Sequence, residues 1–158
     1  MKQVIFLLCL FLVGACKNYK KIAKKNEESV VKNIPQQVFF LEKTSCYGTC
    51  PSYKVVVFDN DSLVYEGNRH VAKEGLMIKQ LPKGAVSQLA EKFRRADFFG
   101  FQNQYTSKMT DFPVTYIAFT DNGLTKKIKD YYKAPESLRQ LEILISDLVK
   151  NEVGVNSN

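Results

Sequence analysis

The sequence has no tryptophan, a single histidine and no apolar run long enough to cross a membrane. A histidine-based metal site or a Ser-His-Asp triad would therefore depend entirely on His70. The longest apolar run, residues 4–13, has ten residues, whereas a membrane-spanning helix needs about 20. Motifs typical of phosphate-binding loops, dinucleotide folds, zinc proteases and serine hydrolases are also absent from the sequence. We expect neither a metal nor a cofactor.

The remaining composition is that of an ordinary globular domain, with 45% apolar and 25% charged residues in a chain of 158. Its formal charge of +7 is unevenly distributed. Residues 17–32 contain six lysines and two glutamates, and the chain from Asn33 onward has sixteen basic and fourteen acidic residues. A nucleic-acid-binding domain carries positive charge on its folded surface. This nearly neutral body therefore argues against nucleic acid as a partner.

Residues 1–15 have the organisation of a secretory signal peptide. A lysine at the second position precedes the apolar run, and small residues follow it. The sequence Val13-Gly14-Ala15-Cys16 resembles the bacterial lipobox. This resemblance implies cleavage before Cys16 and a thioether-linked diacylglycerol on that cysteine, usually with an acylated amine. The same residues also fit ordinary signal-peptidase cleavage after Ala15, without a lipid.

Residues 16–36 are predicted to be a lipidated cysteine followed by a flexible basic tether. The segment is rich in Lys, Asn, Glu and Ser, so it buries too little apolar surface to offset its ordering entropy. A helix over residues 22–31 is the alternative. Lysines beside the lipid would favour an anionic membrane surface. We expect a lipid-anchored protein of the bacterial cell envelope, at the outer membrane and facing the periplasm, whose partner is the membrane through the lipid on Cys16.

Two of the four cysteines, Cys46 and Cys50, lie outside the N-terminal segment. An exported chain reaches an oxidising compartment, where disulfides persist, and Gly48 offers the turn freedom that a small loop needs. We therefore predict a Cys46–Cys50 disulfide. A thiol redox centre, a zinc site and a haem attachment are the alternatives. Redox centres usually have two intervening residues, zinc needs four ligands, and haem attachment needs a histidine directly after the second cysteine.

Alternation of apolar and polar residues predicts strands, and apolar residues at i, i+3, i+4 and i+7 predict helices. The expected strands cover residues 37–42, 52–58, 63–68, 114–120 and 124–132, with a further candidate at 71–81. The first expected helix has its apolar stripe at 83–93 and ends around Ala96-Asp97, and the second covers 135–150. Asn122-Gly123 has the signature of a tight hairpin turn. This order predicts one α+β domain over residues 37–150, in which both helices cover one face of an antiparallel sheet of about five strands. Residues 151–158 are expected to form a disordered tail.

A series of short motifs spans the predicted domain from residue 39 to residue 149. They are Cys46-Tyr47-Gly48-Thr49-Cys50-Pro51-Ser52-Tyr53, Tyr65-Glu66-Gly67, Ala96-Asp97-Phe98, Tyr105, Thr110-Asp111-Phe112-Pro113, and Asp130-Tyr131 with Pro135 and Leu138 following. In this order they resemble a family of uncharacterised bacterial domains, the domain of unknown function numbered 6438, often found in lipoproteins. Phe112 stands where Leu or another apolar residue is expected. The resemblance supports the domain limits and the paired cysteines, and it implies no activity.

Outside the cysteines, the candidate functional surface consists of Tyr47, Tyr105 and Asp111. Asp97 and Asp130 are further candidate carboxylates, but paired-carboxylate catalysis needs a defined separation that a sequence does not reveal. A turn role before Pro113 is the favoured interpretation of Asp111.

Three functional hypotheses follow. The leading one is a non-enzymatic binding or assembly module of the envelope, whose partner is an unidentified envelope protein or ligand. The second is an envelope enzyme that uses Asp111 and Tyr105, with Asp97 as a further candidate. The third is a thiol-redox lipoprotein that uses Cys46 and Cys50.

Overall fold

The computed structural model describes residues 34–108 and 111–154, and the chain from Gln36 onward forms one compact unit. Cys16, the predicted signal peptide and nearly all of the predicted tether lie outside these residues. The elements in chain order are β1 (Gln37–Lys43), β2 (Ser52–Phe58), β3 (Ser62–Arg69), β4 (Gly75–Gln80), α2 (Ala85–Arg95), the 3₁₀ turn η1 (Phe98–Gly100), β5 (Gln104–Tyr105), β6 (Thr115–Asp121), β7 (Leu124–Asp130) and α3 (Glu136–Val153). In the described ranges, no helix is long and apolar enough to span a membrane.

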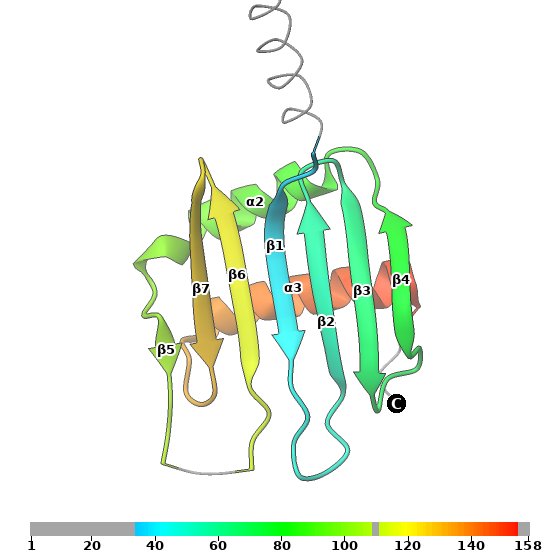
Figure 1. Cartoon of the computed structure of the whole chain (residues 1–158). Coiled ribbons are helices and arrows are strands. Elements are labelled where there is room, and N and C mark those ends of the chain that lie inside the picture. Colours follow the sequence, from blue (N-terminus) through cyan, green and yellow to red (C-terminus); the bar gives the residue numbers. More distant parts are fainter. Residues whose placement is uncertain (1–33, 109–110, 155–158) are drawn as a thin grey trace, which may run out of the picture. The chain divides into compact units, whose positions relative to one another are not determined.

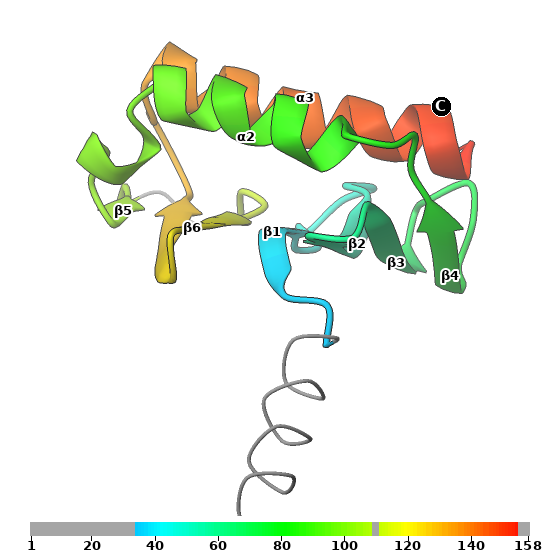
Figure 2. The same cartoon turned by 90° about the horizontal axis from the view of Figure 1, so that it is seen from above.

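The strands form one sheet in the order β4-β3-β2-β1-β6-β7-β5 (Figure 1). Helices α2 and α3 lie across the same face of this sheet (Figure 2). On that face, every second residue of β2 and β3 is buried, as the period-two geometry of a strand requires. The centre of the core is aromatic: the Phe39 ring lies 4.8 Å from that of Phe93 on α2 and 5.1 Å from that of Phe119 on β6, between centroids.

No helix of the described chain covers the opposite face of the sheet (Figure 2). An apolar row crosses this face through directly paired positions, which are Ile78, Val64, Val56, Phe40 and Ala118. In the next row Lys54 forms an ion pair with Glu66 at 3.2 Å. The sheet therefore has one face that forms the core and one that mixes apolar and charged side chains.

The predicted Asn122-Gly123 hairpin is confirmed. Asn122 has a φ of 49° and Gly123 a φ of 78°, and the flanking residues Asp121 and Leu124 are directly paired. Left-handed geometry at both central residues matches the right-handed twist of the flanking strands.

Asp61, in the turn between β2 and β3, caps helix α2 from a distant part of the chain. Its Oδ2 accepts a hydrogen bond from the Gly84 N–H at 2.8 Å, and its Oδ1 accepts one from the Val86 N–H at 2.9 Å. These donors lie at the N-terminus of α2, where the helix itself supplies no acceptors. The Asp61 carbonyl also accepts from the Leu81 N–H at 2.8 Å. The hairpin turn and the start of the helix are therefore joined.

Removing this cap should lower the free energy of unfolding. We expect Asp61→Gly to cost about 1–2 kcal/mol, because two helix donors lose their acceptor while glycine tolerates the φ of 61° at this position. Asp61→Asn keeps one acceptor oxygen and tolerates the same φ, so its loss should be smaller. Urea denaturation followed by circular dichroism measures both. Equal stability of Asp61→Gly and the wild type would contradict the capping role.

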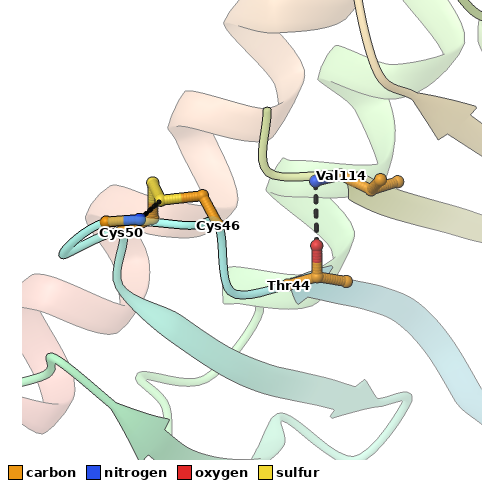
Figure 3. The surroundings of a disulfide bond; sticks show 5 residues. Thr44, Cys46, Cys50 and Val114 are labelled. Atoms are coloured by element: carbon orange, nitrogen blue, oxygen red, sulfur yellow. Dashed lines mark hydrogen bonds between the residues drawn. A yellow bond between two sulfur atoms is a disulfide. The ribbon is translucent and has the colours of Figure 1, made fainter. Parts of the chain in front are cut away.

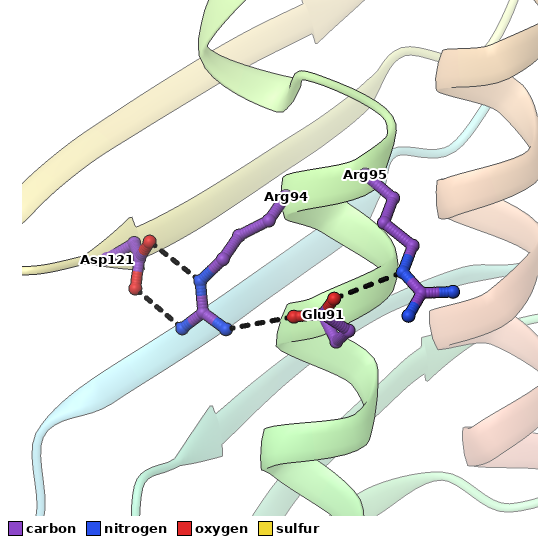
Figure 4. A network of polar contacts seen from close by, with 4 residues as sticks. All are labelled: Glu91, Arg94, Arg95 and Asp121. Carbon is purple, nitrogen blue, oxygen red and sulfur yellow. Dashed lines mark hydrogen bonds and ion pairs between the residues drawn. The ribbon is translucent and has the colours of Figure 1, made fainter.

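A cluster of charged residues connects α2 to the end of β6 (Figure 4). Arg94 donates two hydrogen bonds to Asp121, from Nε at 2.9 Å and from Nη2 at 2.8 Å. The hydrogen bond from Arg94 lowers the pKa of the Asp121 carboxyl. Glu91 lies 3.6 Å from Arg94 Nη1 and 3.0 Å from Arg95 Nε. Such exposed pairs stabilise little individually, and the two-point contact links the last turn of α2 to the end of β6.

The loop between β3 and β4 approaches the backbone of β3 closely. The buried Tyr65 hydroxyl donates to the Lys73 carbonyl at 3.1 Å. A Cβ atom on Gly67 would lie 2.1 Å from the same carbonyl oxygen and 2.7 Å from the Tyr65 hydroxyl oxygen. Only glycine therefore leaves room for this loop.

The predicted class is confirmed, but the count of about five strands is wrong, because the sheet has seven. The candidate at 71–81 forms β4, and the unpredicted strand is β5, which has two residues and pairs in parallel with β7. Helix α2 begins at Ala85 rather than at residue 83, since Gly84 adopts a left-handed φ of 84°. Helix α3 continues beyond residue 150 to the buried Val153. The assignment of residues 151–153 to a disordered tail is therefore wrong.

Candidate functional site

Polar side chains gather at one end of the helix-covered face. A cross-strand row passes from β2 to β7 through Tyr53, Lys43, Thr115 and Asp130. Directly paired residues point to the same face of a sheet, so all four face the helices. The next row on this face contains the fully buried apolar residues Leu41 and Ile117. The polar row is therefore an exception in a face that otherwise forms the core.

Helix α3 places two polar residues against this row. The Tyr53 hydroxyl donates to Ser146 Oγ at 3.1 Å, and Ser146 Oγ donates to the backbone carbonyl of Glu142 at 2.8 Å. Glu142 is only 8% exposed, and its Oε1 is buried without a hydrogen-bond partner. An ionised carboxylate in such a position is costly, because nothing replaces the water it has lost.

The surroundings of Glu142 favour its protonated form. The pKa of Glu142 is raised to about 8, mainly by burial and also by the Asp130 carboxylate, while Lys43 and Arg139 oppose the shift. Burial also raises the pKa of Asp130. A carboxyl group with a pKa near 8 is mostly neutral at pH 7. The cluster then carries one negative charge fewer than its residue types suggest.

Lys43 is the cation of this row. Burial lowers the pKa of the Lys43 ammonium, and the nearby Glu142 acts in the opposite direction. The Nζ atom lies 5.9 Å from the centre of the Tyr53 ring. Among the described residues it has no hydrogen-bond acceptor and no ion-pair partner. The half-buried ammonium group therefore lacks the acceptor that a desolvated charge usually requires.

A cavity of about 180 Å³ opens beside the polar row. Lys43 and Tyr53 line it from the sheet, Val71 from the β3–β4 loop, and Ile143 and Val149 from α3. A second hollow, about 280 Å³ and more open, lies between α2 and α3 and includes no residue of the polar row. The first cavity is therefore the site where polar and apolar groups converge.

Residues 37–149 match the family model described as a domain of unknown function, DUF6438. The chain belongs to this family. The match begins at the first residue of β1 and ends within α3, so the DUF6438 domain contains the whole sheet and the polar row. The membership predicted from the ordered motifs is thereby confirmed. A comparison with curated proteins found no match.

Cys46 and Cys50 lie in the loop between β1 and β2 of the DUF6438 domain. Their sulfur atoms are 2.00 Å apart, the bonding distance of a disulfide (Figure 3). At the base of the loop, the Thr44 N–H donates to the Val114 carbonyl and the Val114 N–H donates to Thr44 Oγ1, both at 2.9 Å. Gly48 has no left-handed φ, so the expectation that the loop needs glycine's freedom is wrong. The cysteine pair closes a short loop whose next residue, Pro51, lines the first cavity.

The structure does not bring the predicted carboxylates together with Tyr105 in either cavity. Asp97 directly precedes the 3₁₀ turn with a φ of 51°, and its carbonyl accepts from the Gly100 N–H at 2.8 Å. Asp111 is exposed and has a φ of 82°, consistent with the turn interpretation.

The two predicted tyrosines are also separate from the cavities. Tyr105 belongs to β5, where it pairs with Asp130, and its hydroxyl accepts from the Gln102 N–H at 3.1 Å. Tyr47 lies in the cysteine loop and is 95% exposed. It remains a candidate for surface contact, but nothing else in the described structure surrounds it.

Sequence reasoning singled out Asp130 as a candidate acid, but it missed the role of Lys43 in the polar row and the partners of the row on α3. A signal was present in the helix, because Glu142 and Ser146 occupy positions of the stripe in which Leu138 and Ile145 are buried. The buried stripe continues through Val149, which is 2% exposed, and not through the adjacent half-buried Leu148. Polar residues at buried helical positions therefore marked the site.

Proposed function

We propose that this protein is a lipid-anchored component of the bacterial cell envelope whose DUF6438 domain is a binding module held beside the membrane. The observation that carries the proposal is the N-terminal pattern of a basic start, ten apolar residues and Val13-Gly14-Ala15-Cys16. A single acyl chain gives reversible membrane binding, whereas two or three chains give a stable anchor. We place the anchor at the outer membrane, and the basic residues that follow Cys16 support a domain that faces the periplasm.

A binding role is better supported than catalysis. The residues of the enzyme hypothesis, Asp97, Tyr105 and Asp111, are absent from the lining of both cavities. For Cys46 and Cys50 we propose a structural role, because three residues separate them and they close the loop next to the first cavity. No observation in the described residues favours the redox hypothesis over this one.

The anchor is tested by replacing the cysteine that carries it. In a bacterial host, the full-length wild type is expected in the membrane fraction and in the detergent phase of a partition assay, with an acylated N-terminal Cys16 in its mass spectrum. Cys16→Ala should lose the lipid mass and move to the aqueous phase, because its acyl chains are the source of membrane affinity.

Cys9→Ala is the matched control, since Cys9 lies inside the apolar run that the proposed cleavage removes. Its mature product should partition as the wild type does. The proposal fails if Cys16→Ala stays in the detergent phase after cleavage, or if mature wild-type protein has an unmodified Cys16.

A further inference from the structure

The first cavity has a distribution of charge and apolar surface that points to a ligand class. Val71, Ile143 and Val149 form apolar walls, whereas Lys43 contributes an ammonium group. The other lysine of the lining, Lys150, is 3.2 Å from Asp147 and is neutralised by it. Lys43 has no such partner in the part of the chain that the structure describes. The cavity thus combines apolar walls with one ammonium group that has no hydrogen-bond or ion-pair partner among the described residues.

The hydroxyl groups of the lining are already committed. The Tyr53 proton goes to Ser146 Oγ, and the Ser146 proton goes to the Glu142 carbonyl. They add no free donors for a multiply charged anion such as inorganic phosphate, which requires several. One unpaired ammonium group beside apolar walls matches a single negative charge on an apolar body.

We propose that this cavity binds a small organic monocarboxylate, with its carboxylate at Lys43 Nζ and its apolar body against Val71, Ile143 and Val149. A volume of about 180 Å³ corresponds to about six water molecules, which restricts the ligand to a small acid. The ligand carboxylate supplies the acceptor that Lys43 lacks. The inference rests on the proposed function only in that it treats the domain as a binding module.

Benzoate is a suitable probe, and benzamide is its uncharged analogue of similar shape. The full-length chain in a nonionic detergent is titrated with each, near neutral pH, and followed by ¹H–¹⁵N NMR. Benzoate should shift the amide signals of Val71, Ser146 and Lys150 in a saturable manner, and benzamide should not. Lys43→Met keeps the aliphatic stem but removes the charge, so it should weaken benzoate binding at least about tenfold.

Lys54→Met is the matched control, because Lys54 lies on the neighbouring strand and on the opposite face of the sheet. It should bind benzoate as the wild type does. Val71→Trp fills the cavity while it leaves Lys43 in place, and it should abolish binding even if Lys43→Met proves unstable. Equal binding of benzamide, unchanged affinity in Lys43→Met, or no saturation by about 10 mM benzoate would overturn the proposal.

The two proposals fail separately. A chain that shows no lipid on Cys16 but binds benzoate through Lys43 removes the anchor and keeps the carboxylate site. A lipidated chain that does not bind benzoate removes the carboxylate site and keeps the anchor.

Discussion

Replacing Gly67 by Ala is expected to lower the free energy of unfolding by about 3 kcal/mol or more. The new methyl group would lie 2.1 Å from the Lys73 carbonyl oxygen. Strand β3 is paired on both sides, by β2 and β4, and so cannot shift away. The loop must move instead, and the buried Tyr65 hydroxyl then loses its acceptor. Urea denaturation followed by circular dichroism provides the measurement.

Gly48→Ala is the matched control for this change. A Cβ at Gly48 would meet no atom closer than Cys46 Sγ, at 3.8 Å, and the position has no left-handed φ. Its effect should stay within about 0.5 kcal/mol. If Gly67→Ala were as stable as Gly48→Ala, the close approach of the loop to β3 would be disproved.

The second large effect is a dependence of stability on pH, which arises from Glu142. Its pKa is about 8 in the folded state, against 4.5 for an unperturbed side chain, so the folded state favours the protonated form. The stability of the wild type should therefore fall as pH rises from about 4.5 to about 8, by at most about 5 kcal/mol. Glu142→Leu removes the titrating group and should lack this component. Urea denaturation across this pH range measures it as the difference between the two proteins.

Glu142→Gln separates charge from polarity. It also lacks the titrating group, so its pH dependence should match that of Glu142→Leu. It should be less stable than Glu142→Leu at every pH, because a buried amide replaces apolar packing. The groups that face Glu142 are Asp130 on β7, Lys43 on β1 and Arg139 on α3, and all three remain in both variants. If the stability of Glu142→Leu depended on pH as that of the wild type does, another group would be the cause.

Local patterns predicted most of the fold because most of its elements are defined locally. An apolar run located β1, alternation located β2 with its hairpin partner β3, and Asn122-Gly123 located the hairpin between β6 and β7. Strand β5 has two residues, too few for any periodicity, and it forms because the chain after η1 passes beside β7. The end of α3 had a signal in Gly154, which takes the left-handed φ of 72° typical of a helix C-cap.

The candidate site was predictable only in part. Tyr53 and Gly67 belong to the motifs that resemble the family. The structure pairs these two residues directly, and Gly67 leaves space for the loop that carries Val71. Lys43 and Glu142 come from the first strand and the last helix, so no local pattern connects them. Their proximity depends on the sheet order and on the path of α3 across the covered face.

That sheet order also affects how the chain reaches its folded state. Strand β1 is the first strand of the domain and lies in the middle of the sheet, between β2 and β6. Its residue Phe39 pairs with nearby Val57 on one side and with distant Phe119 on the other. Closing the longer loop costs more entropy, so the β1–β6 ladder is expected to form late and to slow folding. Until β6 arrives, β1 has a free edge that can pair with the strand of another chain.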